Sequence, residues 1–90
     1  SQGNIEMELI KKSPIKVYGT NWCGDCARVR RLFDEQNVTY IWIDIETDPE
    51  AKKFVEDTNH GFRSVPTIVF PDGSILVEPM TGELKRKLEG

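Results

Sequence analysis

The sequence predicts an α/β domain in which three helices flank a four-stranded mixed sheet, in the order βαβαββα. Short runs rich in β-branched and aromatic residues alternate with segments of helical periodicity. The chain begins with two strands joined through a helix, so these strands should be parallel and their connection right-handed. The turn at residues 71–74 joins the last two strands into an antiparallel hairpin. One sheet is therefore expected to hold both kinds of strand pair.

The first strand is predicted at residues 15–18, where hydrophobic character alternates along the chain. A helix follows over residues 25–36, because Cys26, Val29 and Phe33 recur at helical spacing. Asn37 is expected to end it. This helix also contains Arg28, Arg30 and Arg31, which we interpret as a solvated helix face.

The second strand is predicted at residues 38–45, the run richest in β-branched and aromatic side chains. Asp48 and Pro49 then form a helix start, with Asp48 as the N-cap. The inward stripe of this second helix consists of Ala51, Phe54, Val55 and Thr58. The helix is expected to end near residues 59–61.

The remaining elements are a hairpin and a last helix. Residues 68–70 and 75–77 read as its two strands, on either side of the turn. Thr81 is predicted to cap the last helix, with Leu84 and Leu88 facing inward.

Ninety residues with 38% hydrophobic content predict one small domain over residues 1–90. Residues 1–12 are expected to be a flexible or non-native lead, with Met7 as a possible natural start and a longer native N-terminus as the alternative. A net charge of -3 gives no reason to expect nucleic acid. No apolar run approaches the length of about 18 residues that a membrane span needs, so we expect no membrane partner. A monomer is expected.

The chemistry of the chain is expected at its only two cysteines, Cys23 and Cys26, which stand at C-x-x-C spacing where the first helix begins. The positive end of a helix dipole favours a thiolate at Cys23. A thiolate attacks disulfides, and a second thiol resolves the mixed disulfide that forms. These two residues therefore suffice for thiol–disulfide exchange.

Other interpretations of the two cysteines fit less well. A zinc site needs four Cys or His ligands, and His60 is the only further one, so no metal is expected. A structural disulfide would close too short a loop to stabilise the fold much. A phosphatase-like loop needs an arginine where Val29 stands. A two-cysteine redox protein without an export signal suits a reducing cytoplasm.

The element order, the C-x-x-C after the first strand and Val65-Pro66 before the third strand resemble the thioredoxin superfamily. Few residues precede the motif, which makes the chain similar to the glutaredoxins, although Trp22-Cys23-Gly24 also matches thioredoxins. The resemblance implies that Cys23 is the nucleophile, that Cys26 resolves, and that Pro66 follows a cis peptide bond. It also implies that the backbone before Pro66 pairs with the bound thiol peptide.

Two positions differ from glutathione-using glutaredoxins. Thr20 stands where most of them have a lysine, and residues 77–81 lack their Gly-Gly and Cys/Ser-Asp pairs, which bind the carboxylates of glutathione. Residues 18–23, 63–67 and 70–74 and the Pro79 region are instead similar to actinobacterial mycoredoxins. Those proteins use mycothiol, a sugar-containing thiol without the γ-glutamyl carboxylate of glutathione. The expected co-substrate is thus mycothiol or glutathione, with no tightly bound cofactor.

The residues expected around the bound thiol are Thr20, Trp22, Gly24, Asp25, Arg63, Val65, Pro66 and Thr81. Arg63 is the residue near the loop that could pair with an acidic group. Asp25 has two possible roles. Its charge opposes a thiolate at Cys23 by about 1 kcal/mol, which nearly cancels the helix dipole, whereas a carboxylate in the first turn also stabilises the helix itself.

The sequence thus predicts a thiol–disulfide oxidoreductase of mycoredoxin type that reduces protein or low-molecular-weight mixed disulfides, in electron transport and cell redox homeostasis. One alternative is a dithiol electron donor fed by thioredoxin reductase, for example to ribonucleotide reductase. The alternative of another class is an iron–sulfur carrier, in which the first cysteine and a bound thiol hold a cluster between two protomers.

Overall fold

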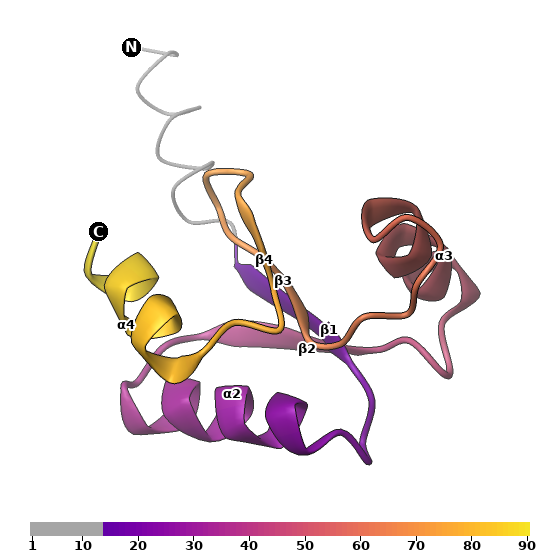
Figure 1. Cartoon of the computed structure of the whole chain (residues 1–90). Coiled ribbons are helices and arrows are strands. Elements are labelled where there is room, and N and C mark those ends of the chain that lie inside the picture. The colour runs from indigo at the N-terminus through magenta and orange to yellow at the C-terminus, as the bar shows by residue number, and fades with distance from the viewer. Residues whose placement is uncertain (1–13) are drawn as a thin grey trace, which may run out of the picture.

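The computed structural model describes residues 14–90, and the expected lead at residues 1–12 lies outside them. The chain follows the predicted βαβαββα order (Figure 1). Its elements are β1 (Ile15–Gly19), α2 (Gly24–Glu35), β2 (Tyr40–Asp44), α3 (Pro49–Thr58), β3 (Thr67–Val69), β4 (Ile75–Val77) and α4 (Thr81–Glu89).

The four strands form one mixed sheet in the order β2-β1-β3-β4. β1 and β2 run parallel, as the crossover through α2 requires. β3 runs antiparallel to both β1 and β4. The predicted α/β fold with a four-stranded mixed sheet is therefore confirmed.

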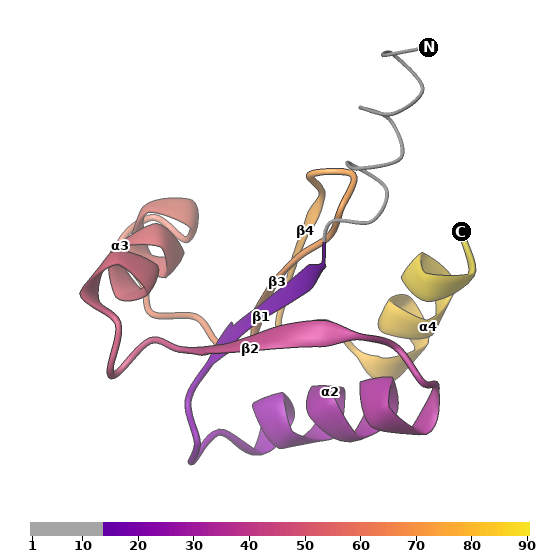
Figure 2. The same ribbon diagram turned by 180° about the vertical axis from the view of Figure 1, so that it is seen from behind.

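The helices cover both faces of this sheet. α2 and α4 lie on one face and α3 on the other, as two opposite views show (Figures 1 and 2). Successive strand residues point to opposite faces, so neighbouring residues of β1 enter different cores. On the α2 side the core is Val17, Val29, Leu32, Phe33, Ile68, Phe70 and Leu84. On the α3 side it is Tyr18, Ile45, Ala51 and Val55.

The predicted helix boundaries hold at α2 and α3. Asn37 follows α2 in the left-handed region, at φ 57°, a conformation that asparagine tolerates better than most residues. The Asp48 side chain accepts a hydrogen bond from the Ala51 backbone N–H at 3.1 Å, so it caps α3 as predicted. Pro49 is the first residue of that helix.

Several boundaries differ from the prediction. β1 extends to Gly19 rather than residue 18, and β3 covers Thr67–Val69 rather than residues 68–70. β2 covers Tyr40–Asp44 rather than residues 38–45, and Val38 is instead bonded to α2, since its N–H donates to the Phe33 carbonyl at 2.8 Å. Met80 rather than Thr81 is the N-cap of α4, without a side-chain cap bond. Within residues 14–90, no helix is long and apolar enough to cross a membrane.

Candidate active site

Cys23 lies immediately before α2 and acts as its N-cap. Its backbone is extended, at φ -81° and ψ 117°, and its Sγ accepts a hydrogen bond from the Cys26 N–H at 3.2 Å. The sulfur thus occupies the place of a capping oxygen at the positive end of the helix dipole. Its side chain is partly exposed, as expected for the outer cysteine of the motif.

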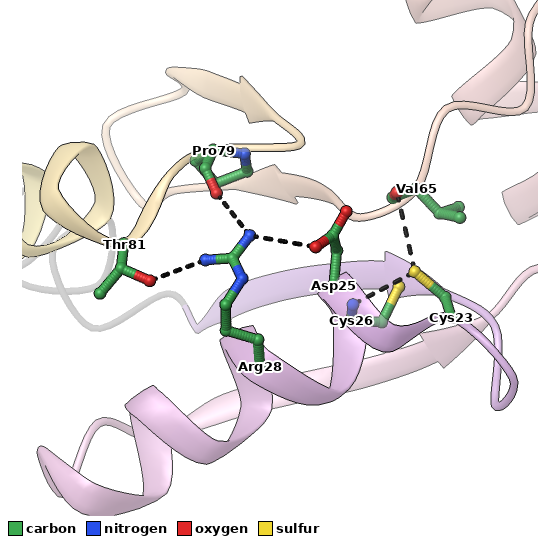
Figure 3. Close-up of polar contacts among 7 residues, drawn as sticks. All are labelled: Cys23, Asp25, Cys26, Arg28, Val65, Pro79 and Thr81. Carbon is green, nitrogen blue, oxygen red and sulfur yellow. Dashed lines mark hydrogen bonds and ion pairs between the residues drawn. The ribbon is translucent and has the colours of Figure 1, made fainter.

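Cys26 lies in the first turn of α2 and is only 1% exposed. Burial raises the pKa of its thiol to about 12, and the Cys23 side chain beside it adds to this effect. Cys26 is therefore a neutral thiol near pH 7. Both cysteines are free (Figure 3), one open to solvent and one behind it.

The Val65–Pro66 loop faces Cys23 from across the site (Figure 3). Its peptide bond is cis, as the resemblance implied. The Cys23 thiol donates toward the Val65 carbonyl, with Sγ and O 3.8 Å apart. The Pro66 carbonyl accepts the Glu78 N–H at 2.8 Å. This second bond joins the loop to the end of β4.

An open cleft of about 490 Å³ surrounds Cys23. Its lining is Trp22, Cys23, Gly24, Asp25, Phe62, Arg63, Ser64, Val65 and Glu78. The lining thus includes two carboxylates, Asp25 and Glu78, and one guanidinium, that of Arg63. Trp22 and Phe62 are 73% and 71% exposed, so the cleft presents two accessible aromatic rings, and its charged side chains carry a net negative charge.

Trp22 is held in this rim by a hydrogen bond. Its Nε1 donates to Glu46 Oε1 at 2.6 Å, which joins the residue before Cys23 to the chain just after β2. Gly24 has open space around its α carbon, with no atom within 4 Å of the position that a Cβ would take. The residue before Cys23 is therefore fixed by a hydrogen bond, and the residue after it is accessible.

Thr20 does not line the cleft around Cys23 but a cavity that adjoins it. The residue is 4% exposed, and its Oγ1 has no hydrogen-bond partner within residues 14–90. Together with Trp22, Arg63 and Val65 it lines this second cavity, of about 260 Å³. Residue 20 therefore offers a bound thiol neither a cation nor an exposed side chain.

Arg28 does not belong to a solvated helix face, so this part of the prediction was wrong. Its guanidinium donates to Thr81 Oγ1 and to the Pro79 carbonyl, both at 2.9 Å, and lies 3.6 Å from Asp25 Oδ1 (Figure 3). The segment before α4 thus does have a cation, supplied by α2. The Thr81 hydroxyl, expected at the bound thiol, is occupied by this bond.

Arg30 is also not simply solvated. Its guanidinium carbon lies 4.2 Å from the centre of the Trp42 ring, and its Nε donates to the Tyr40 hydroxyl at 3.4 Å. Nothing in the local spacing indicates these contacts, because they join α2 to β2. Arg31 is exposed, as predicted.

Within the described residues there is no group of three or more His, Cys, Asp or Glu side chains that could hold a metal ion. The reactive groups of the site are the two cysteine thiols. One is accessible at a helix start and the other is buried behind it.

A mixed sheet of this topology, with a dithiol at the start of its first helix and a cis-proline loop opposite, defines a thioredoxin-like protein. The glutaredoxin family model matches residues 15–75, and the chain belongs to the glutaredoxin family. Its class of activity is accordingly that of a thiol–disulfide oxidoreductase.

Relatives and solved structures agree with this assignment. A Mycobacterium tuberculosis protein that bears the name glutaredoxin is 40% identical over 74 residues, 82% of this chain and 88% of its own length. Mycoredoxin 1 of Corynebacterium glutamicum is 35% identical over 77 residues, 86% of this chain and 95% of its own. The crystal structure of an Archaeoglobus fulgidus glutaredoxin superposes with a TM-score of 0.70 at 25% identity, covering 88% of this chain and 89% of its own. The similarity to mycoredoxins that the motifs indicated is thus supported.

Proposed function

We propose that this chain reduces mixed disulfides between proteins and a low-molecular-weight thiol, with mycothiol as the reducing thiol. The observation that carries the proposal is the pairing of an accessible Cys23 sulfur, at the head of α2, with a buried Cys26 thiol behind it. Cys23 is the nucleophile and Cys26 the resolving thiol. A reducing compartment such as the cytoplasm suits this chemistry.

In the first step, the Cys23 thiolate attacks the mycothiol sulfur of a mixed disulfide. A bond forms between Cys23 Sγ and that sulfur, and the protein thiolate leaves and takes up a proton. In the second step, Cys23 Sγ is attacked either by the thiolate of another mycothiol or by Cys26, whose thiol gives up its proton in this step. The Cys26 route releases mycothiol and leaves a Cys23–Cys26 disulfide, which a further thiol pair or a reductase must reduce.

The Val65 backbone supports the docking of the substrate. Its carbonyl lies beside Cys23 Sγ and can accept an N–H from an extended substrate segment. The exposed Trp22 and Phe62 side chains provide apolar contact on the rim. The cleft thus suits a peptide or small thiol that places its sulfur between the loop and α2.

The charge of the cleft favours mycothiol over glutathione. Asp25 and Glu78 repel carboxylates, and Arg63 is the single cation of the lining. Arg28 lies nearby, but Asp25, Pro79 and Thr81 already engage its guanidinium. Thr20 is buried without a charge. Glutathione, with two carboxylates, therefore meets more repulsion here than a sugar-linked thiol.

The test is the reduction of one model mixed disulfide with mycothiol, glutathione or thioredoxin reductase and its own reductant, run in parallel. We expect turnover with mycothiol to exceed turnover with glutathione by about tenfold or more. Glu78→Lys should raise the glutathione rate, because it turns a repelling group into an attracting one. Glu83→Lys, on the exposed surface of α4, is the matched control for the added charge.

Efficient turnover with glutathione in the unaltered protein would contradict the choice of mycothiol. Turnover with thioredoxin reductase alone would favour the dithiol electron donor instead. A brown colour with charge-transfer absorbance after anaerobic purification would favour the iron–sulfur carrier.

A further inference from the structure

The resolving cysteine packs closely over Gly19, the last residue of β1. A Cβ added at Gly19 would lie 2.6 Å from Cys26 Sγ and 2.7 Å from Cη2 of Trp42. Both distances are too short for a real Cβ, so a glycine is required there. The Cys26 sulfur and the edge of the Trp42 ring therefore both border the space where another residue would place its side chain.

Trp42 reaches this space from β2. It is partly buried against the core on the α2 side of the sheet, and Arg30 stacks over its ring at 4.2 Å. Cys26 and Arg30 are one helical turn apart, so they lie on the same side of α2. The indole thus has a cation over its ring and lies, beside Gly19, near the buried thiol.

The two tryptophans of the chain lie near different cysteines. Trp22 precedes Cys23 and is 73% exposed, whereas Trp42 is on the side of Cys26. Sulfur next to an aromatic ring edge is a favourable arrangement. Cys26 Sγ and the Trp42 ring both lie within 3 Å of the position that a Cβ at Gly19 would take, so the ring takes up part of the space beside this sulfur.

We propose that Trp42 is a positioning residue for the resolving step: beside Gly19, it holds Cys26 Sγ where it attacks Cys23. The inference rests on the dithiol route of the proposed function. In that step the Cys26 thiolate bonds to Cys23 Sγ, the bond from Cys23 to the substrate thiol breaks, and that thiol leaves as a thiolate. The proton of Cys26 passes to solvent. Trp42 forms no bond in the reaction.

The step can be followed with dithiobisnitrobenzoate, a disulfide whose thiol product is coloured. With one equivalent of reagent, attack by Cys23 releases a first coloured thiol, and attack by Cys26 on the resulting mixed disulfide releases a second. Trp42→Leu should slow the second release by about fivefold or more and leave the first within about twofold. Trp42→Phe, which keeps a ring, should restore much of the second rate. Ile41→Ala, an exposed position of the same strand, should change neither.

A second readout is the fluorescence of Trp22→Phe, a variant in which Trp42 is the only tryptophan. Its emission should fall when the dithiol is oxidised, because the disulfide forms near the ring, and Cys26→Ser should abolish the change. This measurement does not depend on whether Trp42→Leu folds.

Equal rates of the second release in the unaltered protein, Trp42→Leu and Trp42→Phe would overturn the positioning role, as would emission unaffected by oxidation. A failure of the proposed dithiol route would look different. In that case the unaltered protein itself would release only the first coloured thiol.

Discussion

The guanidinium of Arg28 donates to the hydroxyl of Thr81 at 2.9 Å, across 53 positions of the sequence. The bond joins the helix that begins at the dithiol to the helix that ends the fold. The same guanidinium also donates to the Pro79 carbonyl at 2.9 Å. This bond fixes the segment that leads into α4. The Arg28 side chain therefore links α2 to the segment that begins α4.

Replacement of Arg28 by alanine should lower the free energy of unfolding by about 1–2 kcal/mol. Hydrogen bonds to a charged group are worth about 1.5–3 kcal/mol, and the partial exposure of this side chain reduces that figure. Urea unfolding measures the change. Arg31→Ala, at an exposed position of the same helix, is the control and should be nearly neutral. Equal stability of the two variants would show that the Arg28 contacts contribute nothing.

Asp25→Asn tests whether the carboxylate tunes the dithiol. The side chain is 59% exposed and lies 3.6 Å from Arg28, whose charge offsets part of its effect on Cys23. We expect the alkylation of Cys23 by iodoacetamide to become about twofold faster at neutral pH, because a repelling charge is removed. An unchanged rate with a lower Tm would leave Asp25 as a helix-start residue only.

Gly19→Ala should destabilise the protein by about 1–3 kcal/mol, the range for an overpacked core. The new Cβ would have to displace Cys26 Sγ or the Trp42 ring. Gly82→Ala is a suitable comparison, since its Cβ would meet only Arg86 Nη1 at an ordinary 3.5 Å. Thermal unfolding of both variants measures the difference. If Gly19→Ala were as stable as Gly82→Ala, the packing at Gly19 would not be tight.

The buried thiol predicts a pH dependence of stability. Burial raises the pKa of Cys26 from 9.0 to about 12 in the folded protein, so above pH 9 the unfolded chain loses this proton while the folded chain keeps it. The stabilising contribution is full below pH 9 and is lost as the pH rises toward 12. Unfolding of the reduced protein should therefore become easier across this range, and less steeply so in Cys26→Ala. Parallel curves for the two proteins would contradict the shift.

Much of the fold could be predicted because its signals are local. The spacing of Cys26, Val29 and Phe33 indicated α2, and Asp48-Pro49 indicated the start of α3. The dithiol was visible for the same reason, since both cysteines lie within one turn. Only the superfamily resemblance, rather than any local signal, indicated the cis bond at Pro66.

The remaining features depend on contacts between distant segments. Arg28 could not be assigned to Thr81 from its own helix, where it looks like one of three solvated arginines. The approach of Trp42 and Cys26 to the same space over Gly19 depends on the register of β1 and β2 and on the absence of a side chain at Gly19. The burial of Thr20 follows from packing in the same way.

The measurement that tests the central claim most directly is the reduction of a mycothiol–protein mixed disulfide by the unaltered protein, Cys23→Ser and Cys26→Ser, with mycothiol as reductant. We predict that Cys23→Ser is inactive, because no other accessible thiol exists in the chain. Cys26→Ser should still turn over, since mycothiol can attack the Cys23 mixed disulfide directly. Full activity of Cys23→Ser would contradict the assignment of Cys23 as the nucleophile.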